Sequence, residues 1–111
     1  MISGAHVILF TEAADEARAF LADALGLRSV DVGGGWLIFA LPPAELAVHP
    51  AGASRHELYF MCDDLEATMR GLAQKGASFG AARDAEWGRL VTMTLPGGAS
   101  MGMYEPRHIR P

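Results

Sequence analysis

The chain alternates short apolar runs with amphipathic stretches, in an order that occurs twice. In the first half, residues 6–10 form a β-type run, and residues 13–25 place apolar side chains on one helical face after Thr11, a suitable N-cap. Gly26 stands where a residue in the left-handed conformation ends a helix. Three further β-type runs follow, over residues 28–32, 36–41 and 45–49.

The second half repeats this order. Residues 58–62 form a β-type run, and Asp63 with Glu66 three residues later has the spacing of a capping box. A helix over about 65–75 follows, and Gly76 ends it. Further β-type runs cover residues 77–81, 89–95 and 100–105.

Shared landmarks in the two halves suggest an internal duplication, because Phe10, Gly26 and Trp36 match Phe60, Gly76 and Trp87. The sequence therefore predicts a single α+β domain over residues 1–111, with βαβββ modules at about 4–50 and 55–107. Each module alone would leave one face of a small sheet exposed. The modules are therefore expected to cover each other, within the chain or across a dimer.

Composition narrows the functional classes. Hydrophobic residues make up 50% of the chain and charged residues 20%, which excludes a disordered chain. The 9 Lys and Arg against 13 Asp and Glu give a net charge of −4, so nucleic acid is not an expected partner. The longest apolar run, residues 36–41, is too short to span a membrane. With no signal sequence visible at its start and a single cysteine, Cys62, the protein is expected to be soluble and cytoplasmic.

Two short motifs suggest chemistry that their context excludes. Residues 76–80 read G-x-S-x-G, but a serine-hydrolase elbow joins a strand to a helix, whereas these residues follow a helix. His56-Glu57 begins like a zinc-protease motif, but Phe60 stands where the second histidine belongs. The basic residues 107–111 are interpreted as a solvated tail.

The remaining candidates for chemistry are imidazole and carboxylate groups on the predicted strands. Such groups suit Zn, Ni, Mn, Fe or Co, and two or three of them facing one cavity would be able to hold a catalytic ion. Taken one at a time, each is also typical of an ordinary structural side chain. They are His6, His49, His56, Glu57 and Glu105.

Several stretches carry a resemblance to a known family. They are residues 6–10, 20–27 and 63–67, and the run from Pro96-Gly97-Gly98 to residues 103–106. Together with the two βαβββ halves, they resemble the vicinal oxygen chelate superfamily, the glyoxalase, bleomycin-resistance and extradiol-dioxygenase group. The resemblance implies a curved mixed sheet around a cup, completed in a homodimer. Metal-dependent members bind a divalent ion with residues from the first and last strands of each module, and several binding-protein members have no metal.

The resemblance assigns metal positions on the first strand of each module. His6 takes the first position, and the second falls on either Glu57 or His56. Adjacent strand residues face opposite ways, so only one of the two can enter the cup. Glu57 is favoured, because the opposite face then carries an apolar stripe suited to packing under the helix, made of Leu58, Phe60 and Cys62.

The last-strand positions make the metal site incomplete in this register. They fall on Leu46 and Gly102, neither of which binds a metal, so His6 and Glu57 remain as a weak pair for metal binding or catalysis. The alternative register gives four ligands: His6, His49, His56 and Glu105.

The expected cup has apolar walls and few polar groups, which suits a small aromatic or amphipathic ligand. The sequence and the resemblance therefore predict a protein that binds such a ligand and has no metal cofactor. The alternative is a divalent-metal-dependent lyase, isomerase or dioxygenase that acts on a substrate chelated through vicinal oxygens. A metal-free enzyme with His6 or Glu57 as general base, or a protein-interaction module, are further alternatives. The expected lining residues are Ile8, Trp36, Leu46, Val48, Tyr59, Trp87 and Tyr104.

Overall fold

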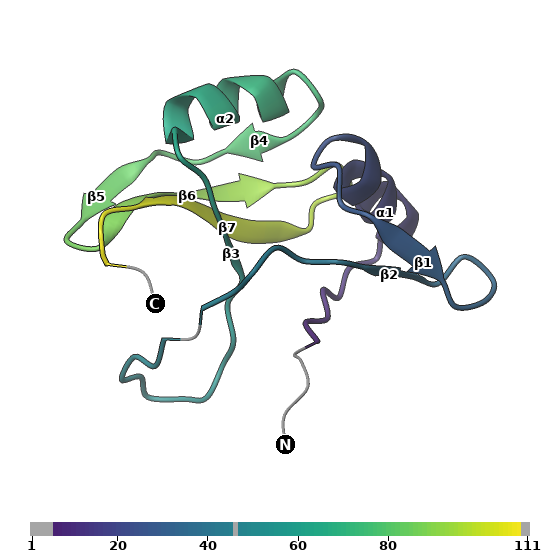
Figure 1. The fold of residues 1–111 in the computed structure, drawn as a ribbon, viewed down its shortest axis with the longest axis horizontal. Helices are drawn as coiled ribbons and strands as arrows, with labels where there is room; N and C mark the ends of the chain where they lie inside the picture. The colour runs from purple at the N-terminus through teal and green to yellow at the C-terminus, as the bar shows by residue number, and fades with distance from the viewer. Residues whose placement is uncertain (1–5, 46, 110–111) are drawn as a thin grey trace.

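The computed structural model describes residues 6–45 and 47–109, which form an α+β fold as predicted (Figure 1). Two helices accompany a two-stranded sheet and a five-stranded sheet in this part of the chain. In chain order the elements are α1 (Ala14–Asp23), β1 (Ser29–Asp31), β2 (Leu37–Phe39), β3 (Tyr59–Met61), α2 (Leu65–Ala73), β4 (Ser78–Phe79), β5 (Arg83–Ala85), β6 (Gly88–Thr94) and β7 (Ser100–Pro106).

The five-stranded sheet belongs to the second half of the chain. Its strand order is β3-β7-β6-β4, and β5 pairs with β6 beyond the end of β4. β3 runs parallel to β7, and the other pairs are antiparallel. All the strands predicted here are confirmed, and β5 is an additional one that forms a hairpin with β6. The sheet is therefore mixed, as predicted.

Helix α2 covers one face of this sheet, and its first turn has two carboxylate partners. Asp64, not Asp63, is the N-cap, since its Oδ1 accepts a hydrogen bond from the Ala67 backbone N at 3.1 Å. The predicted capping box was therefore one residue out of register. Glu105 Oε1 accepts a second bond from the Leu65 backbone N at 3.0 Å. Two of the helix's free N–H groups are thereby satisfied by acceptors that also suit the positive end of its dipole.

The hydrophobic core lies between the five-stranded sheet and the two helices. The first half of the chain contributes Ala17 and Phe20 from α1. The predicted stripe of Leu58, Phe60 and Cys62 packs against this core, which confirms the alternation expected for β3. The other buried members are Leu65, Leu72, Ala77, Val91, Met93, Leu95, Met101 and Met103.

The first half forms fewer strands than predicted. β1 and β2 make an antiparallel hairpin that projects away from the larger sheet, with Val30 opposite Ile38 (Figure 1). Residues 6–10, and the described residues of 45–49, form no strand. In the second half the first and last strands, β3 and β7, pair with each other. Residues 6–10 and the described residues of 45–49 are the corresponding segments of the first half, and within the described chain they do not pair with each other. A β-type run without a partner leaves its backbone N–H and C=O groups unpaired, so these segments do not form strands.

Neither helix in the described part of the chain is long and apolar enough to cross a membrane.

Candidate functional site

The five-stranded sheet has a second face, opposite α2, that carries large aromatic and polar side chains. Met103 and Val91 point to the core, so their neighbours Tyr104 and Leu90 lie on the other face. The strand register continues this row across the sheet, because Arg83 pairs with Leu90, Leu90 with Tyr104, and Tyr104 with Met61. The face away from α2 therefore presents a cross-strand row from β5 to β3.

Three aromatic rings form a cluster on this face. Tyr59, Trp87 and Tyr104 contact one another edge to face, with ring centroids 5.0 to 6.1 Å apart. The Tyr59 ring lies directly over Gly102, where a Cβ atom would overlap it. Such edge-to-face contacts fix the ring orientations, so the cluster forms a preorganised apolar wall.

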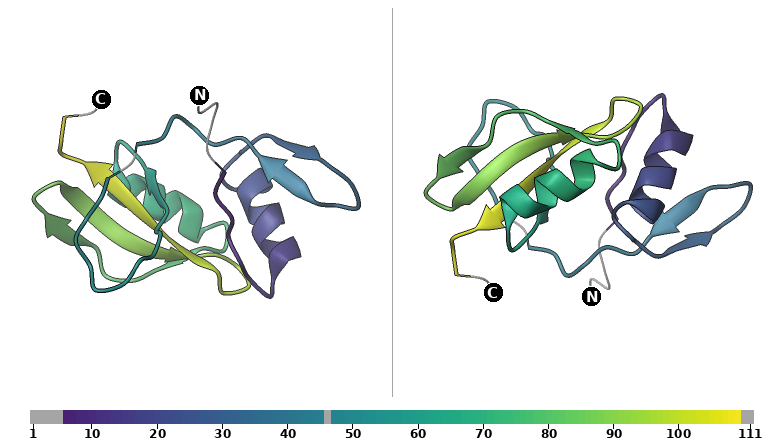
Figure 2. Two further views of the ribbon diagram at one scale, coloured as in Figure 1. Left: turned by 90° about the horizontal axis from the view of Figure 1, so that it is seen from below. Right: turned by 90° about the horizontal axis from the view of Figure 1, so that it is seen from above.

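The loop between the two halves passes over this face, and the two together border an open hollow of about 1500 Å³. We call this hollow the cup. Helix α2 and the loop lie on opposite sides of the sheet in the two views of Figure 2. The sheet supplies the aromatic cluster together with Met61 and Arg83, and His108 adds a side chain from the C-terminal segment. The loop supplies residues 41–45 and 47–57.

Two polar groups of side chains border the aromatic cluster. The Tyr104 hydroxyl shares a hydrogen bond with His108 Nε2 at 3.0 Å, and this nitrogen is 4.0 Å from Glu45 Oε2. On the other side, Arg55 Nε donates to Glu57 Oε1 at 3.3 Å. Each carboxylate in the cup thus has a basic partner nearby.

The hydroxyl of Tyr59 belongs to the second group. Burial, and then the negative charge of Glu57, raise the pKa of Tyr59 above its ordinary value of 10.0, although Arg83 and Arg55 act in the opposite direction. Tyr59 therefore remains a neutral hydrogen-bonding group at physiological pH.

The structure brings together part of the set expected from the sequence. Within the described chain the residues of that set that line the cup are Val48, His49, His56, Glu57, Tyr59, Trp87 and Tyr104. Leu46 lies outside the described residues.

Three of the expected residues lie elsewhere in the single chain. His6, Ile8 and Trp36 do not line the cup, and all three are exposed. The Trp36 side chain is on the hairpin, where the guanidinium of Arg18 lies 5.5 Å from its ring centroid. It was expected to line the same cup as Trp87, but its hairpin projects away from the larger sheet.

Glu105 lies on the opposite side of the sheet from the cup. Its carboxylate is bonded to the first turn of α2, and it pairs in register with Arg89 on the face that carries the core. The alternative ligand set is therefore not brought together: His49 and His56 line the cup, Glu105 contacts α2 on the other side of the sheet, and His6 lies outside the cup. Within the described residues no three His, Cys, Asp or Glu side chains are grouped as a metal site would require.

Sequence reasoning missed several charged or basic residues of the cup, namely Glu45, Arg55, Arg83 and His108. His108 was assigned to a solvated tail, but the Arg107 backbone N donates to the Trp87 carbonyl at 2.9 Å and holds the segment against the sheet. An ion pair of 3.0 Å between Arg107 and Asp84 adds to this attachment. The sequence signal for this contact is that His108 follows Tyr104 by four residues. That spacing brings the two side chains together only because β7 ends between them, at Pro106.

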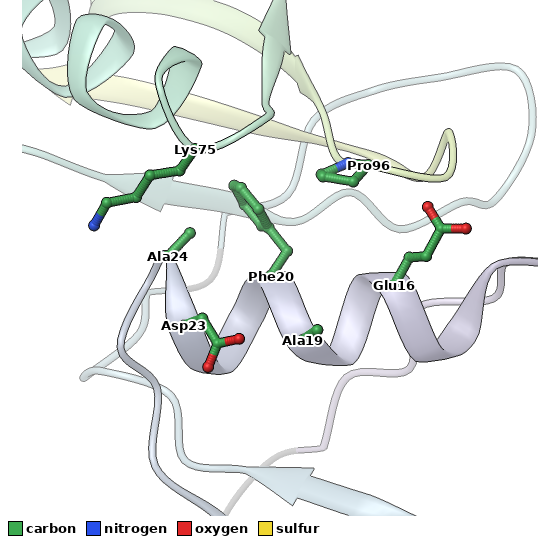
Figure 3. Close-up of a pocket in the computed structure, with 7 residues that line it drawn as sticks. All are labelled: Glu16, Ala19, Phe20, Asp23, Ala24, Lys75 and Pro96. Atoms are coloured by element: carbon green, nitrogen blue, oxygen red, sulfur yellow. The ribbon is translucent and has the colours of Figure 1, made fainter.

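A second, smaller hollow of about 500 Å³ lies between α1 and the second half. Phe20 extends from α1 into the space between Lys75 and Pro96 (Figure 3). Since Phe20 is buried and belongs to the core, this hollow is a packing groove where the two halves meet. It lacks the aromatic cluster that distinguishes the cup.

Comparison with known proteins identifies the fold. No family model and no curated protein matches the sequence. Among solved structures, the antibiotic binding protein TnmS3 from Streptomyces sp. CB03234 superimposes with a TM-score of 0.64 at 22% identity, over 96% of this chain and 99% of that one. A glyoxalase/bleomycin resistance protein from the same organism gives 0.60 at 21% identity, over 87% and 95%.

A lactoylglutathione lyase from Agrobacterium tumefaciens gives a TM-score of 0.65 at 18% identity, over 94% of each chain. These likenesses span nearly whole chains, which agrees with the resemblance found in the sequence. The chain therefore has the same fold as these glyoxalase/bleomycin-resistance-like proteins.

Proposed function

We propose that this protein binds a small aromatic or amphipathic organic molecule in the cup. The observation that carries the proposal is the fixed cluster of Tyr59, Trp87 and Tyr104 on the wall of a hollow large enough for a drug-sized ligand. The similarity to an antibiotic binding protein supports a binding role. The single free cysteine, Cys62, is consistent with a cytoplasmic location, which we propose as well.

The experiment is a binding screen with planar aromatic compounds, followed by two substitutions on β7. Tyr104→Leu should weaken binding at least tenfold, because it removes the central ring of the cluster. Glu105→Gln is the matched control, since the neighbouring side chain lies on the other face of the same strand. The proposal is wrong if both variants bind as well as the wild type, or if both lose binding equally.

We further propose a homodimer in which a second copy covers the first half of the chain. Large apolar side chains are exposed on the hairpin and on residues 7–10, and where such side chains gather on a surface they usually mark an interaction site. Phe10 is 86% exposed and Trp36 69% exposed, although both are large apolar side chains. The other exposed members are Val7, Ile8, Val30, Val32 and Ile38.

Sedimentation velocity tests the dimer. Ile38→Lys should shift the protein to a monomer at micromolar concentration, because it places a charge opposite Val30 in the hairpin. Ile109→Lys is the matched control, since Ile109 is 98% exposed on the C-terminal segment. A monomeric wild type, or an equal effect of both substitutions, would contradict the dimer.

A metal does not fit the residues at the family's ligand positions. Gly102 has no side-chain donor, and Glu57 is the one carboxylate among the positions assigned in the favoured register. His6 lies outside the cup, so it would approach Glu57 only from a second copy of the chain. Even that arrangement supplies two donors where a divalent site ordinarily has three or more. We therefore assign His6 and Glu57 to ligand contact or proton transfer across the proposed dimer, and derive no metal-dependent step.

A further inference from the structure

Among the described residues that line the cup, Arg83 is an arginine without a carboxylate within ion-pair distance. Glu57 is paired with Arg55, and Glu45 lies 4.0 Å from His108. The chain as a whole has a net charge of −4, so an unbalanced positive group in the cup is a local exception.

Arg83 lies at a defined place relative to the aromatic cluster. It is opposite Leu90 on β6, and Leu90 is opposite Tyr104 on β7, so all three side chains share one face. Neighbouring strands are about 4.8 Å apart, which separates the Arg83 and Tyr104 backbones by about 10 Å. An aromatic ring against the cluster would therefore place a substituent on its edge within reach of the flexible arginine side chain.

We propose that the cup selects aromatic ligands that carry one anionic group, with the ring against the Tyr59–Trp87–Tyr104 cluster and the anion paired with the guanidinium of Arg83. This inference rests on the proposed function, because it names the chemical class of the ligand bound there. A guanidinium pairs with a carboxylate through two parallel hydrogen bonds, and apolar surroundings strengthen such a pair. Arg83 is therefore a specificity-determining residue.

A cationic ligand fits the same cup less well. It would have to use Glu45 or Glu57, and each of these already has a basic side chain beside it. It would also bring a second positive charge close to Arg83, and like charges repel. A neutral ligand would gain the aromatic contacts but would leave Arg83 unpaired.

The test compares three naphthalene probes of similar size by isothermal titration calorimetry: naphthalene-2-carboxylate, the neutral naphthalene-2-carboxamide and 2-naphthylmethylammonium. We expect the wild type to bind the carboxylate at least tenfold more tightly than the carboxamide, and the ammonium most weakly. Arg83→Gln should remove the preference by weakening carboxylate binding at least tenfold while changing carboxamide binding less than twofold. Arg70→Gln, on the exposed surface of α2, is the matched control and should retain the preference.

Arg83→Lys provides a second variant, since it keeps the charge but loses the planar fork, and it should retain part of the preference. Equal binding of all three probes, tighter binding of the ammonium, or an equal loss of both carboxylate and carboxamide in Arg83→Gln would overturn the role of Arg83. In the first two of these outcomes the aromatic cup would still stand. Failure of every probe to bind would instead overturn the proposed function together with this inference.

Discussion

The contact between Tyr59 and Gly102 gives a sharp test of how the cup is built. Gly102 has an ordinary backbone conformation, so an alanine there would not be strained by its φ angle. Its added Cβ would nevertheless overlap the Tyr59 ring. Overpacking of this kind costs about 1–3 kcal/mol. The loss of glycine's freedom in the unfolded chain offsets about 0.5–1 kcal/mol of that. Gly102→Ala should therefore lower the free energy of unfolding by about 1 kcal/mol, and by no more than about 2.5 kcal/mol.

Removal of the tyrosine ring should abolish or reverse the destabilisation that Gly102→Ala causes. In a Tyr59→Ala background the overlap is gone, and Gly102→Ala should be neutral or stabilise the fold by about 0.5 kcal/mol. Urea denaturation followed by circular dichroism measures all four proteins of this cycle. Gly71→Ala is the control, because a Cβ at Gly71 meets open space in the middle of α2 and should stabilise the helix by up to about 1 kcal/mol. An equal effect of Gly102→Ala in both backgrounds would refute the placement of Tyr59 over β7.

Three further predictions concern stability and the two faces of the sheet. Burial raises the pKa of Cys62 in the folded state above its ordinary value of 9.0. Burial and the negative charge of Glu57 raise the pKa of Tyr59 above 10.0. These groups stabilise the fold below those values, and the stabilisation is lost as pH rises through the folded pKa. The free energy of unfolding should therefore decline above about pH 9. Cys62→Ser should reduce the earliest part of this decline. A wild type whose stability is constant from pH 8 to 11 contradicts this. Asp64→Ala should lower the free energy of unfolding by about 0.5–2 kcal/mol, whereas Asp63→Ala should change it little; the reverse order would restore the capping box expected from the sequence. Glu105→Ala should lower it by about 1 kcal/mol without affecting ligand affinity, and loss of ligand or metal binding in that variant would favour the alternative register.

The second half of the chain could be predicted closely from its sequence. Strict alternation in residues 58–62 identified which side of β3 faces the core, and the turn at Gly76, with φ +103°, was visible from its position after the helix. These features depend on local geometry and on one buried face, and the periodicity of apolar residues in the sequence predicts both. The placement of Tyr59 on the face opposite this core followed from the same alternation.

The first half and the polar groups of the cup could not be predicted in this way. Residues 6–10 have a β-type pattern, but a strand also needs a partner, and no pattern within a single chain says whether that partner is present. The contact between His108 and Tyr104 depends on where β7 ends, which is the least predictable property of an element. Arg83 was missed because β5 is only three residues long and lacks apolar alternation.

The identity of the binding site can be tested by nuclear magnetic resonance on protein freed of metal with a chelator and titrated with naphthalene-2-carboxylate. We expect the largest shift changes at Tyr59, Met61, Trp87 and Tyr104, with the same affinity before and after metal removal. Shift changes centred instead on Phe20 and Lys75, in the groove beside α1, or binding that requires an added divalent ion, would contradict ligand binding in a metal-free aromatic cup.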